Sequence, residues 1–106
     1  MELNITQRLM LMPLVPEDGI SLVDLYVARD LHRQLGFTEE EQARFEFVQE
    51  DDRLRWNPEA DVPVDIRIGP RAHVLMQDVF KKMIDDKTLK RDQIDLYELF
   101  KDDDEE

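Results

Sequence analysis

Cysteine is absent from this chain of 106 residues, and so is any long hydrophobic run. Without cysteine the chain can form neither a disulfide framework nor a thiolate metal site. The longest apolar run covers residues 9–15 and contains Pro13, whereas a helix needs roughly 20 apolar residues to cross a bilayer. The first residues lack the basic segment and the cleavage site of a secretion signal. We therefore expect a soluble, cytoplasmic protein that does not bind membranes.

The sequence also lacks the motifs that carry common enzyme chemistry. Its three glycines are scattered singly, whereas phosphate-binding loops need closely spaced glycines. Neither His32 nor His73 has a metal ligand four residues further on, and no serine stands in a Gly-x-Ser-x-Gly elbow. The acidic runs 39–41 and 50–52 do not follow the spacing of a calcium loop. We predict that the protein is not an enzyme and has no catalytic residue, cofactor or metal site.

Negative charge is in large excess. The chain has 26 acidic and 14 basic residues, which gives a formal net charge of −12. Such a surface repels nucleic acids and anionic membranes, because both attract proteins through Lys and Arg. A basic protein partner suits this charge, although solubility alone would also account for it. We expect a basic protein partner and no direct contact with nucleic acid.

The length and composition predict one domain with an acidic end. The length is close to the commonest domain size, and 42% of the residues are hydrophobic, which is enough for one core. Residues 102–106 are all acidic, and such a run is usually solvated. We expect residues 1–101 to form a single compact domain and residues 102–106 to be a disordered tail.

Three helices are predicted in the first half of the chain from their N-terminal caps. Asn4, Ser21 and Thr38 are each followed, three residues later, by a side chain that can complete a capping box. Apolar residues repeat with helical spacing after the first two caps. The three predicted helices extend to Pro13, to Gly36 and to about Phe45.

The pattern then changes to that of strands. Residues 45–47 and 54–56 alternate apolar and polar side chains on either side of a polar bend at 50–52, which predicts a hairpin. Residues 62–68 alternate in the same way. Pro63 has no N–H, so that end of the strand is expected at a sheet edge. Together these segments predict a small antiparallel meander of three strands.

Two helices complete the predicted fold. From Ala72 to Ile84, apolar side chains recur every three or four residues, as in a helix that packs on a core. A last helix is predicted over about 91–101. Helices before and after a small meander indicate an α+β fold, with the helices packed on one sheet face.

Four side chains around the predicted meander are candidates for a binding surface. Arg53 and Arg55 are expected on the polar face of one strand and Arg67 on that of its neighbour. They can form cross-strand charge pairs with acidic residues, or they can form a patch that recognises anions. Trp56 can serve as an interface residue or can pack at the end of a strand. The sequence leaves both alternatives open.

The apolar run in residues 9–15 is a further candidate for a binding surface. One helix face cannot bury all of it, so Met10, Leu11 or Val15 must reach either the core from a loop or a partner. A homodimer through this segment would cover an apolar patch that monomers rarely expose.

Five segments spread over most of the chain carry a resemblance: Thr6-Gln7-Arg8-Leu9, Leu35-Gly36-Phe37-Thr38-Glu39-Glu40-Glu41, Trp56-Asn57, Ile66-Arg67-Ile68-Gly69 and Leu96-Tyr97-Glu98-Leu99-Phe100. Together they resemble small uncharacterised proteins found in bacterial and phage genomes. The resemblance implies a bacterial or phage origin. It implies no catalytic or binding residue.

These observations favour a non-catalytic protein-binding module, an accessory or regulatory factor whose acidic surface meets a basic partner. A variant is a nucleic-acid mimic, which requires acids arrayed on one face at phosphate-like spacing. A second class is a self-associating structural or assembly subunit. An enzyme ranks last, because it would need an apolar pocket lined by His73, Arg71 or a buried carboxylate.

Overall fold

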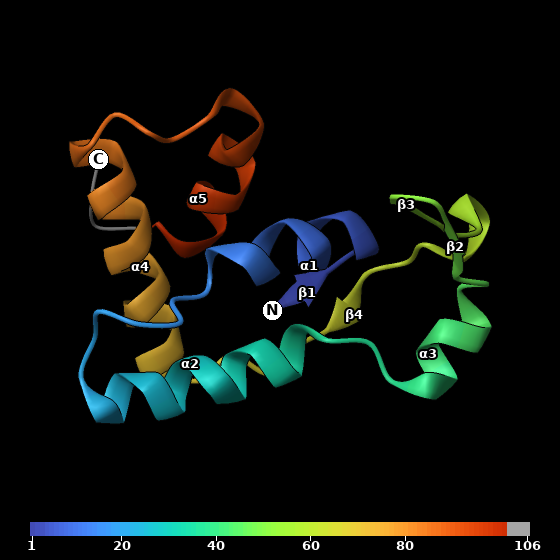
Figure 1. The fold of residues 1–106 in the computed structure, drawn as a ribbon, viewed down its shortest axis with the longest axis horizontal. Coiled ribbons are helices and arrows are strands. Elements are labelled where there is room, and N and C mark those ends of the chain that lie inside the picture. The colour runs from blue at the N-terminus through green and yellow to red at the C-terminus, as the bar shows by residue number, and fades with distance from the viewer. Residues whose placement is uncertain (102–106) are drawn as a thin grey trace.

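The computed structural model describes residues 1–101, in which helices pack around one very small sheet and a second small sheet lies at one end of the molecule (Figure 1). In chain order the elements are β1 (Glu2–Leu3), α1 (Ile5–Leu11), α2 (Leu22–Leu35), α3 (Glu39–Arg44), β2 (Val48–Glu50), β3 (Arg53–Arg55), β4 (Val64–Asp65), α4 (Pro70–Asp85) and α5 (Ile94–Phe100). Short 3-10 turns cover Met12–Leu14, Pro58–Ala60 and Arg91–Gln93. The predicted α+β class is confirmed. The prediction for residues 102–106 lies outside the described residues.

The predicted helix starts are confirmed at the level of single hydrogen bonds. The Asn4 side chain accepts a bond of 2.8 Å from the Gln7 amide, and the Gln7 side chain accepts one of 2.9 Å from the Asn4 amide. Thr38 and Glu41 form the same reciprocal box at α3. The Ser21 hydroxyl accepts a bond from an amide in the first turn of α2. These caps satisfy backbone donors that have no partner within the helix.

The strands are antiparallel as predicted, but they form two separate two-stranded sheets rather than one meander. β2 pairs with β3, whereas β4 pairs with β1, with Leu3 opposite Val64. The reason lies in the segment between β3 and β4, where Pro58 begins a 3-10 turn and Pro63 can donate no ladder hydrogen bond. The chain therefore leaves the hairpin and pairs with the N-terminal residues instead.

The hairpin is also shifted along the chain from its predicted place. Phe45 ends α3, and Glu46 has a positive φ of 59° that turns the backbone, so the first strand begins only at Val48. The predicted strand over 62–68 is reduced to Val64–Asp65. From Val64 to Ile68 the apolar residues are buried or half-buried as the alternating pattern predicted, but Val62 is exposed. Extended backbone without a neighbouring strand forms no ladder.

One apolar core joins the helices to the β1–β4 sheet. Met76 and Phe80 of α4 are completely buried, and Leu3 of β1 is as well. The other buried members come from α1, α2, α4 and α5, from the residue after the first 3-10 turn and from the residue after β4: Leu11, Val15, Ala28, Leu31, Leu35, Ile66, Ala72, Leu75, Leu96 and Phe100. Burial of this apolar surface is the main source of the stability of this region.

The chain from Phe37 to Asn57 forms a second region, which we call the hairpin arm. It contains α3, β2 and β3, and Figure 1 shows these elements together at the end of the molecule away from α4 and α5. Four aromatic rings pack within it. The ring centroids of Phe37 and Phe47 are 4.8 Å apart, and Phe45 and Trp56 both lie about 6 Å from Phe47. The arm therefore has a small aromatic cluster of its own.

Candidate functional site

The N-terminal apolar run contributes mainly to the core. Leu11 is 1% exposed and Val15 is 5% exposed, so neither can reach a partner. Met10 is half-buried and packs against the same core. The cause is the 3-10 turn at Met12–Leu14, which redirects the chain at Pro13 so that residues on both sides of the turn face inward. Of the two roles left open by the sequence, the structure shows the core role for Leu11 and Val15.

The three arginines do not form the predicted shared surface. Arg53 and Arg55 lie on β3, whereas Arg67 follows β4, which belongs to the other sheet. Arg55 pairs with Glu50 at 3.1 Å, and both side chains are more than half exposed. This is the charge-pair alternative for Arg55, and exposed pairs of this kind contribute little stability. The expectation that Arg67 lies beside Arg53 and Arg55 is wrong, because β3 and β4 are not neighbours.

Trp56 packs at the end of its strand. Its side chain is half-buried, and its ring centroid lies 6.2 Å from that of Phe47. This is the packing alternative for Trp56, although part of the ring remains open to solvent.

The histidines have no arrangement suited to metal binding. His32 is exposed on α2, and His73 packs 5.4 Å from the ring of Phe100. Within residues 1–101, no group of three or more His, Asp or Glu side chains is placed to hold a metal ion. Across the same residues, no helix combines the length and apolar character that a bilayer crossing requires.

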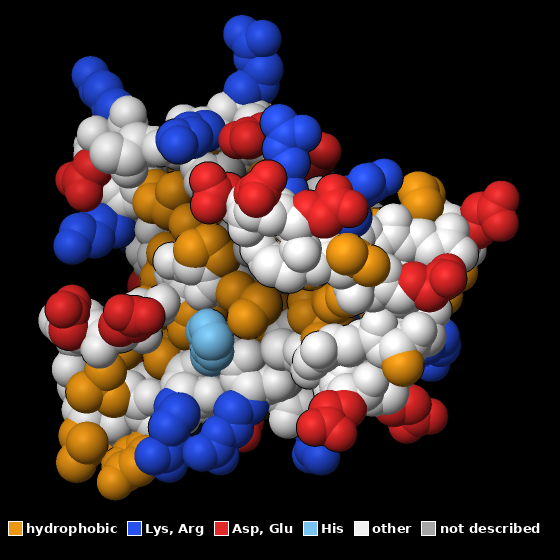
Figure 2. All heavy atoms as spheres, turned by 45° about the vertical axis from the view of Figure 1, so that its right-hand side comes forward, with side chains coloured by type: hydrophobic (Ala, Val, Ile, Leu, Met, Phe, Trp, Pro, Cys, Tyr) orange, Lys and Arg blue, Asp and Glu red, His pale blue; other side chains and the backbone are white. Residues whose placement is uncertain are grey.

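The surface in Figure 2 mixes charges of both signs with patches of hydrophobic side chains. Acidic groups (red) and basic groups (blue) alternate across this face, and orange apolar side chains lie exposed between them. On this face the acids are interspersed with cations and do not form an unbroken array.

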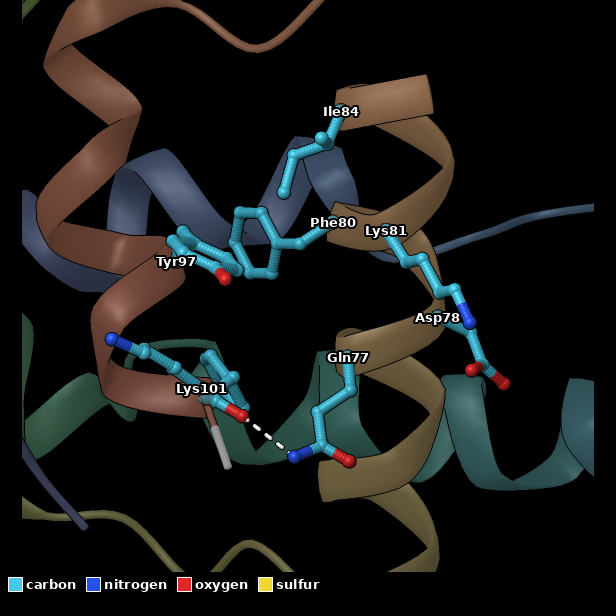
Figure 3. Close-up of a pocket in the computed structure, with 8 residues that line it drawn as sticks. Gln77, Asp78, Phe80, Lys81, Ile84, Tyr97 and Lys101 are labelled. Carbon is cyan, nitrogen blue, oxygen red and sulfur yellow. Dashed lines mark hydrogen bonds between the residues drawn. The ribbon is translucent and has the colours of Figure 1, made fainter. Parts of the chain in front are cut away.

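A small cavity between α4 and α5 has a volume of about 250 Å³ (Figure 3). Phe80, Tyr97 and Phe100 form its aromatic walls, and Lys81 lies at its rim. The Gln77 amide donates a hydrogen bond of 2.8 Å to the Phe100 carbonyl, so it ties the two helices together. Asp78 is the one carboxylate among the lining residues, so the cavity holds no pair of carboxylates for acid–base chemistry.

A larger depression of about 500 Å³ lies between α4 and the loop that leads into α2. Its apolar lining consists of Leu14, Pro16, Ile20, Leu75, Val79 and Met83. Its charged lining consists of Asp18, Asp24, Asp78, Asp86 and Lys82. Four carboxylates and one ammonium group therefore surround an apolar floor.

This depression continues along α4. A neighbouring hollow of about 380 Å³ shares Asp24, Leu75 and Asp78 with it and extends to Pro70, Arg71 and Val74. We call the two together the α4 groove. α4 has 16 residues, so at 1.5 Å per residue the groove follows a helix about 24 Å long.

The groove exists because the apolar face of α4 extends beyond the part of the helix that the core covers. Met76 and Phe80 face inward, but Val79 and Met83 are only half-buried and Val74 is 53% exposed. Within residues 1–101, the ion pairs involve none of the groove carboxylates. These carboxylates are therefore available to a cation from outside.

Sequence reasoning missed this site because it assigned the whole apolar arc of α4 to the core. The arc from Ala72 to Ile84 has apolar residues on adjacent sides of the helix, and a stripe of that width covers more than one packing face. Asp78 and Asp86 flank the outer side of that arc. The width of this apolar stripe, together with the acidic residues at its border, could have indicated the groove from the sequence.

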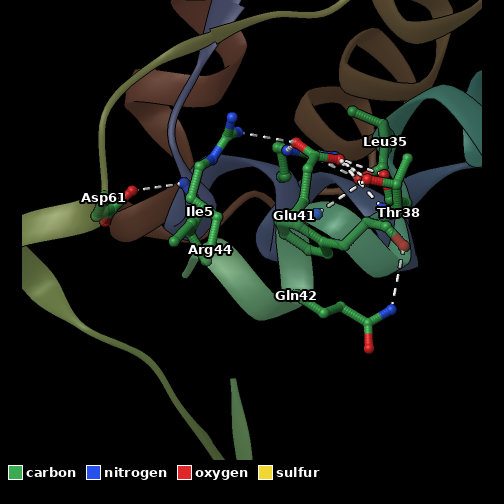
Figure 4. A network of polar contacts seen from close by, with 10 residues as sticks. Ile5, Leu35, Thr38, Glu41, Gln42, Arg44 and Asp61 are labelled. Atoms are coloured by element: carbon green, nitrogen blue, oxygen red, sulfur yellow. Dashed lines mark hydrogen bonds and ion pairs between the residues drawn. The ribbon is translucent and has the colours of Figure 1, made fainter. Parts of the chain in front are cut away.

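A buried polar network joins α1 to the hairpin arm (Figure 4). Arg8 is 1% exposed and pairs with Glu41 at 2.7 Å. Its guanidinium also donates to the Leu35 carbonyl at 3.1 Å and to the Gly36 carbonyl, and it stacks 4.0 Å from the centre of the Phe37 ring. Each of the three guanidinium nitrogens donates to a protein acceptor, so the network is structural.

Glu41 is held in its charged form by this network. The hydrogen bond from Arg8 lowers the pKa of the Glu41 carboxyl, and the amide of Thr38 lowers it further. Partial burial acts in the opposite direction but does not cancel these effects. Glu41 is therefore an ionised partner for a buried cation, not a general acid.

No protein-family model, curated protein or solved structure matches this chain. The function must therefore be inferred from the geometry and chemistry of the α4 groove.

Proposed function

We propose that this protein is a non-catalytic protein-binding module that holds a basic segment of a partner protein in the α4 groove. The observation that carries the proposal is the apolar floor of the groove, which is bordered by four carboxylates and by only two cations, Lys82 and Arg71. Burial of the floor supplies affinity, because transfer of apolar surface out of water is favourable. The carboxylates supply selectivity, because they favour a partner with Lys or Arg beside its apolar residues.

The charge of the whole chain supports the same kind of partner. A net charge of −12 attracts a basic protein over a distance of about one Debye length, roughly 8–10 Å at physiological salt. Association of this kind is faster at low salt, whereas apolar contacts depend much less on salt. Binding to the groove should therefore weaken as salt is raised without disappearing.

Capture from a cell lysate with matched variants tests this proposal. Met83 and Ile84 are adjacent apolar residues of α4, but only Met83 lines the groove. We expect the wild-type protein and the Ile84→Lys variant to retain the same partner, and the Met83→Lys variant to lose it. Thermal unfolding must show that both variants remain folded. Equal capture by both variants, or no capture by the wild-type protein, would contradict a binding role for the groove.

Self-association is a second candidate, supported by the outer face of α2. Leu22 is 65% exposed and Tyr26 is 55% exposed, and these residues lie one turn apart. A second copy of the chain could cover such a face. Light scattering over a wide range of concentration tests this function, and a mass that stays at the monomer value would exclude it.

A further inference from the structure

The shape of the α4 groove limits which conformation a bound segment can adopt. Its floor is a strip along one helix, where Leu75, Val79 and Met83 recur at every turn. The opposite wall is formed by the loop before α2, with Leu14 and Ile20. The groove is therefore open along its length, and a bound segment must lie roughly parallel to α4.

An extended segment fits this groove poorly. Its backbone N–H and C=O groups need partners when they are buried, and an unpaired group carries a large desolvation cost. A sheet edge normally supplies those partners, but no residue of β1 to β4 is among the lining residues. The polyproline conformation is recognised by aromatic-lined grooves, and no aromatic residue lines this one.

A helix meets both requirements, because it satisfies its own backbone hydrogen bonds and presents side chains once per turn. Its apolar residues can then pack between those of α4 as ridges pack into grooves. Met83 adds an adaptable contact, since methionine fills irregular gaps.

The carboxylates indicate where the charges of that helix lie. Asp18 and Asp24 stand on the wall formed by the loop and α2, and Asp78 and Asp86 stand on the α4 side. Asp78 and Asp86 are separated by eight residues, which corresponds to about 12 Å along the helix axis. Cations are therefore expected on both borders of the apolar stripe.

We infer that the α4 groove binds an amphipathic basic helix of a partner protein, with an apolar stripe facing the half-buried Val79 and Met83 and with Lys or Arg on both sides. This inference rests on the proposed function and specifies its ligand. At 1.5 Å per residue, the length of α4 allows a bound helix of about 16 residues. A free peptide of that length is only marginally helical in water, so binding should increase its helicity.

A synthetic peptide provides the probe. It has about 16 residues, with leucine on one helical face and lysine on the other, and blocked ends. A second peptide carries proline at its centre, and a third has the same composition in an alternating order. We expect only the first peptide to bind with a gain of helicity by circular dichroism, and the proline peptide to bind at least about tenfold more weakly.

Charge-matched variants show whether binding occurs in the groove. Asp78→Asn with Asp86→Asn removes two groove carboxylates, and Asp85→Asn with Asp92→Asn removes two exposed carboxylates outside the groove. The first pair should weaken peptide binding by about tenfold, since charge-assisted contacts are lost, and the second pair should have a much smaller effect.

The outcomes separate the inference from the function on which it rests. Equal binding of the helical, alternating and proline peptides, without a gain of helicity, would overturn the helix inference. Equal weakening of peptide binding by both pairs of variants would also overturn it, because the peptide would then be attracted by the overall negative charge and not by the groove. In either case, a lysate partner that is lost with Met83→Lys would leave the proposed function standing. If the peptide tests fail and Met83→Lys also retains the lysate partner, both the helix inference and the proposed function are overturned.

Discussion

The body of the molecule and its hairpin arm are stabilised by different means. The body has a continuous apolar core in which Met76 and Phe80 are completely buried. The arm has four aromatic rings and is joined to α1 through the buried pair of Arg8 and Glu41. Apolar packing tolerates changes that preserve volume, whereas a buried ion pair depends on both partners. The arm is therefore the region that one polar substitution can release from an intact body.

The largest effect is expected from a substitution in the body. Phe80→Ala removes a ring that is completely buried and that packs about 6 Å from the rings of Tyr97 and Phe100. We expect it to lower the free energy of unfolding by about 3–5 kcal/mol. Urea unfolding measures this change, and hydrogen exchange should show loss of protection in both regions. Protection that remains in α4 would show that the body does not depend on this contact.

A smaller and more localised effect is expected from Arg8→Met. The variant removes the Arg8 donors from Glu41 and from two backbone carbonyls. Glu41 keeps only its contacts with Thr38 and Arg44. We expect a loss of about 3 kcal/mol, at the lower end for a broken buried pair. The lower end is expected because the Glu41 side chain is 13% exposed and can turn toward water. Hydrogen exchange should show that α3 opens before α4.

Arg44→Met is the matched control for this prediction. Arg44 also approaches Glu41, at 4.0 Å, but its side chain is 55% exposed. Its loss should change stability by less than about 1 kcal/mol. An equal effect of the two substitutions would mean that the arm is not held by the buried pair.

The difference between the regions should also depend on pH. The pKa of Glu41 is lowered in the folded state from its ordinary value of 4.5. A lowered carboxyl pKa stabilises the fold at pH values above 4.5, and this contribution disappears as the pH falls through the folded-state pKa. The free-energy difference between the wild-type protein and Glu41→Gln should therefore shrink as the pH falls below about 4.5. A difference that stays constant as the pH is lowered through this range would contradict the role assigned to the carboxylate.

The smallest effect on stability is expected from the groove. Asp78→Asn with Asp86→Asn removes exposed carboxylates that form no ion pair within residues 1–101. Stability should change by no more than about 0.5 kcal/mol for each surface substitution. Thermal unfolding checks this, and a large loss would mean that the groove acids support the body instead of a partner.

The sequence predicted those elements whose causes are local. The capping boxes at Asn4 and Thr38 and the apolar repeat of α4 depend on residues three or four positions apart, and the structure contains all of them. The pairing of β1 with β4 joins segments more than 60 residues apart, so no local pattern indicated it.

The buried arginine escaped prediction for a similar reason. An arginine in an amphipathic helix normally lies at the surface, and Arg8 is buried only because Glu41 and the end of α2 supply its acceptors. The candidate site was missed because the sequence shows that a residue of α4 is apolar but not whether a neighbouring element covers it. Val79 and Met83 follow the same pattern as Phe80, yet they remain partly open.

Hydrogen bonds at the base of the β2–β3 hairpin should allow residues to be inserted at its tip without disturbing the rest of the fold. The backbone amide of Asn57 donates to the Phe45 carbonyl at 2.9 Å, and the Asn57 side chain donates to the Glu46 carboxylate at 2.7 Å. These bonds join the residues before β2 to those after β3. Its tip at Asp51 and Asp52 is exposed. Exposed loop tips of this kind accept inserted residues most readily. A fluorescent label or an epitope placed there would report on binding while leaving α4 unchanged.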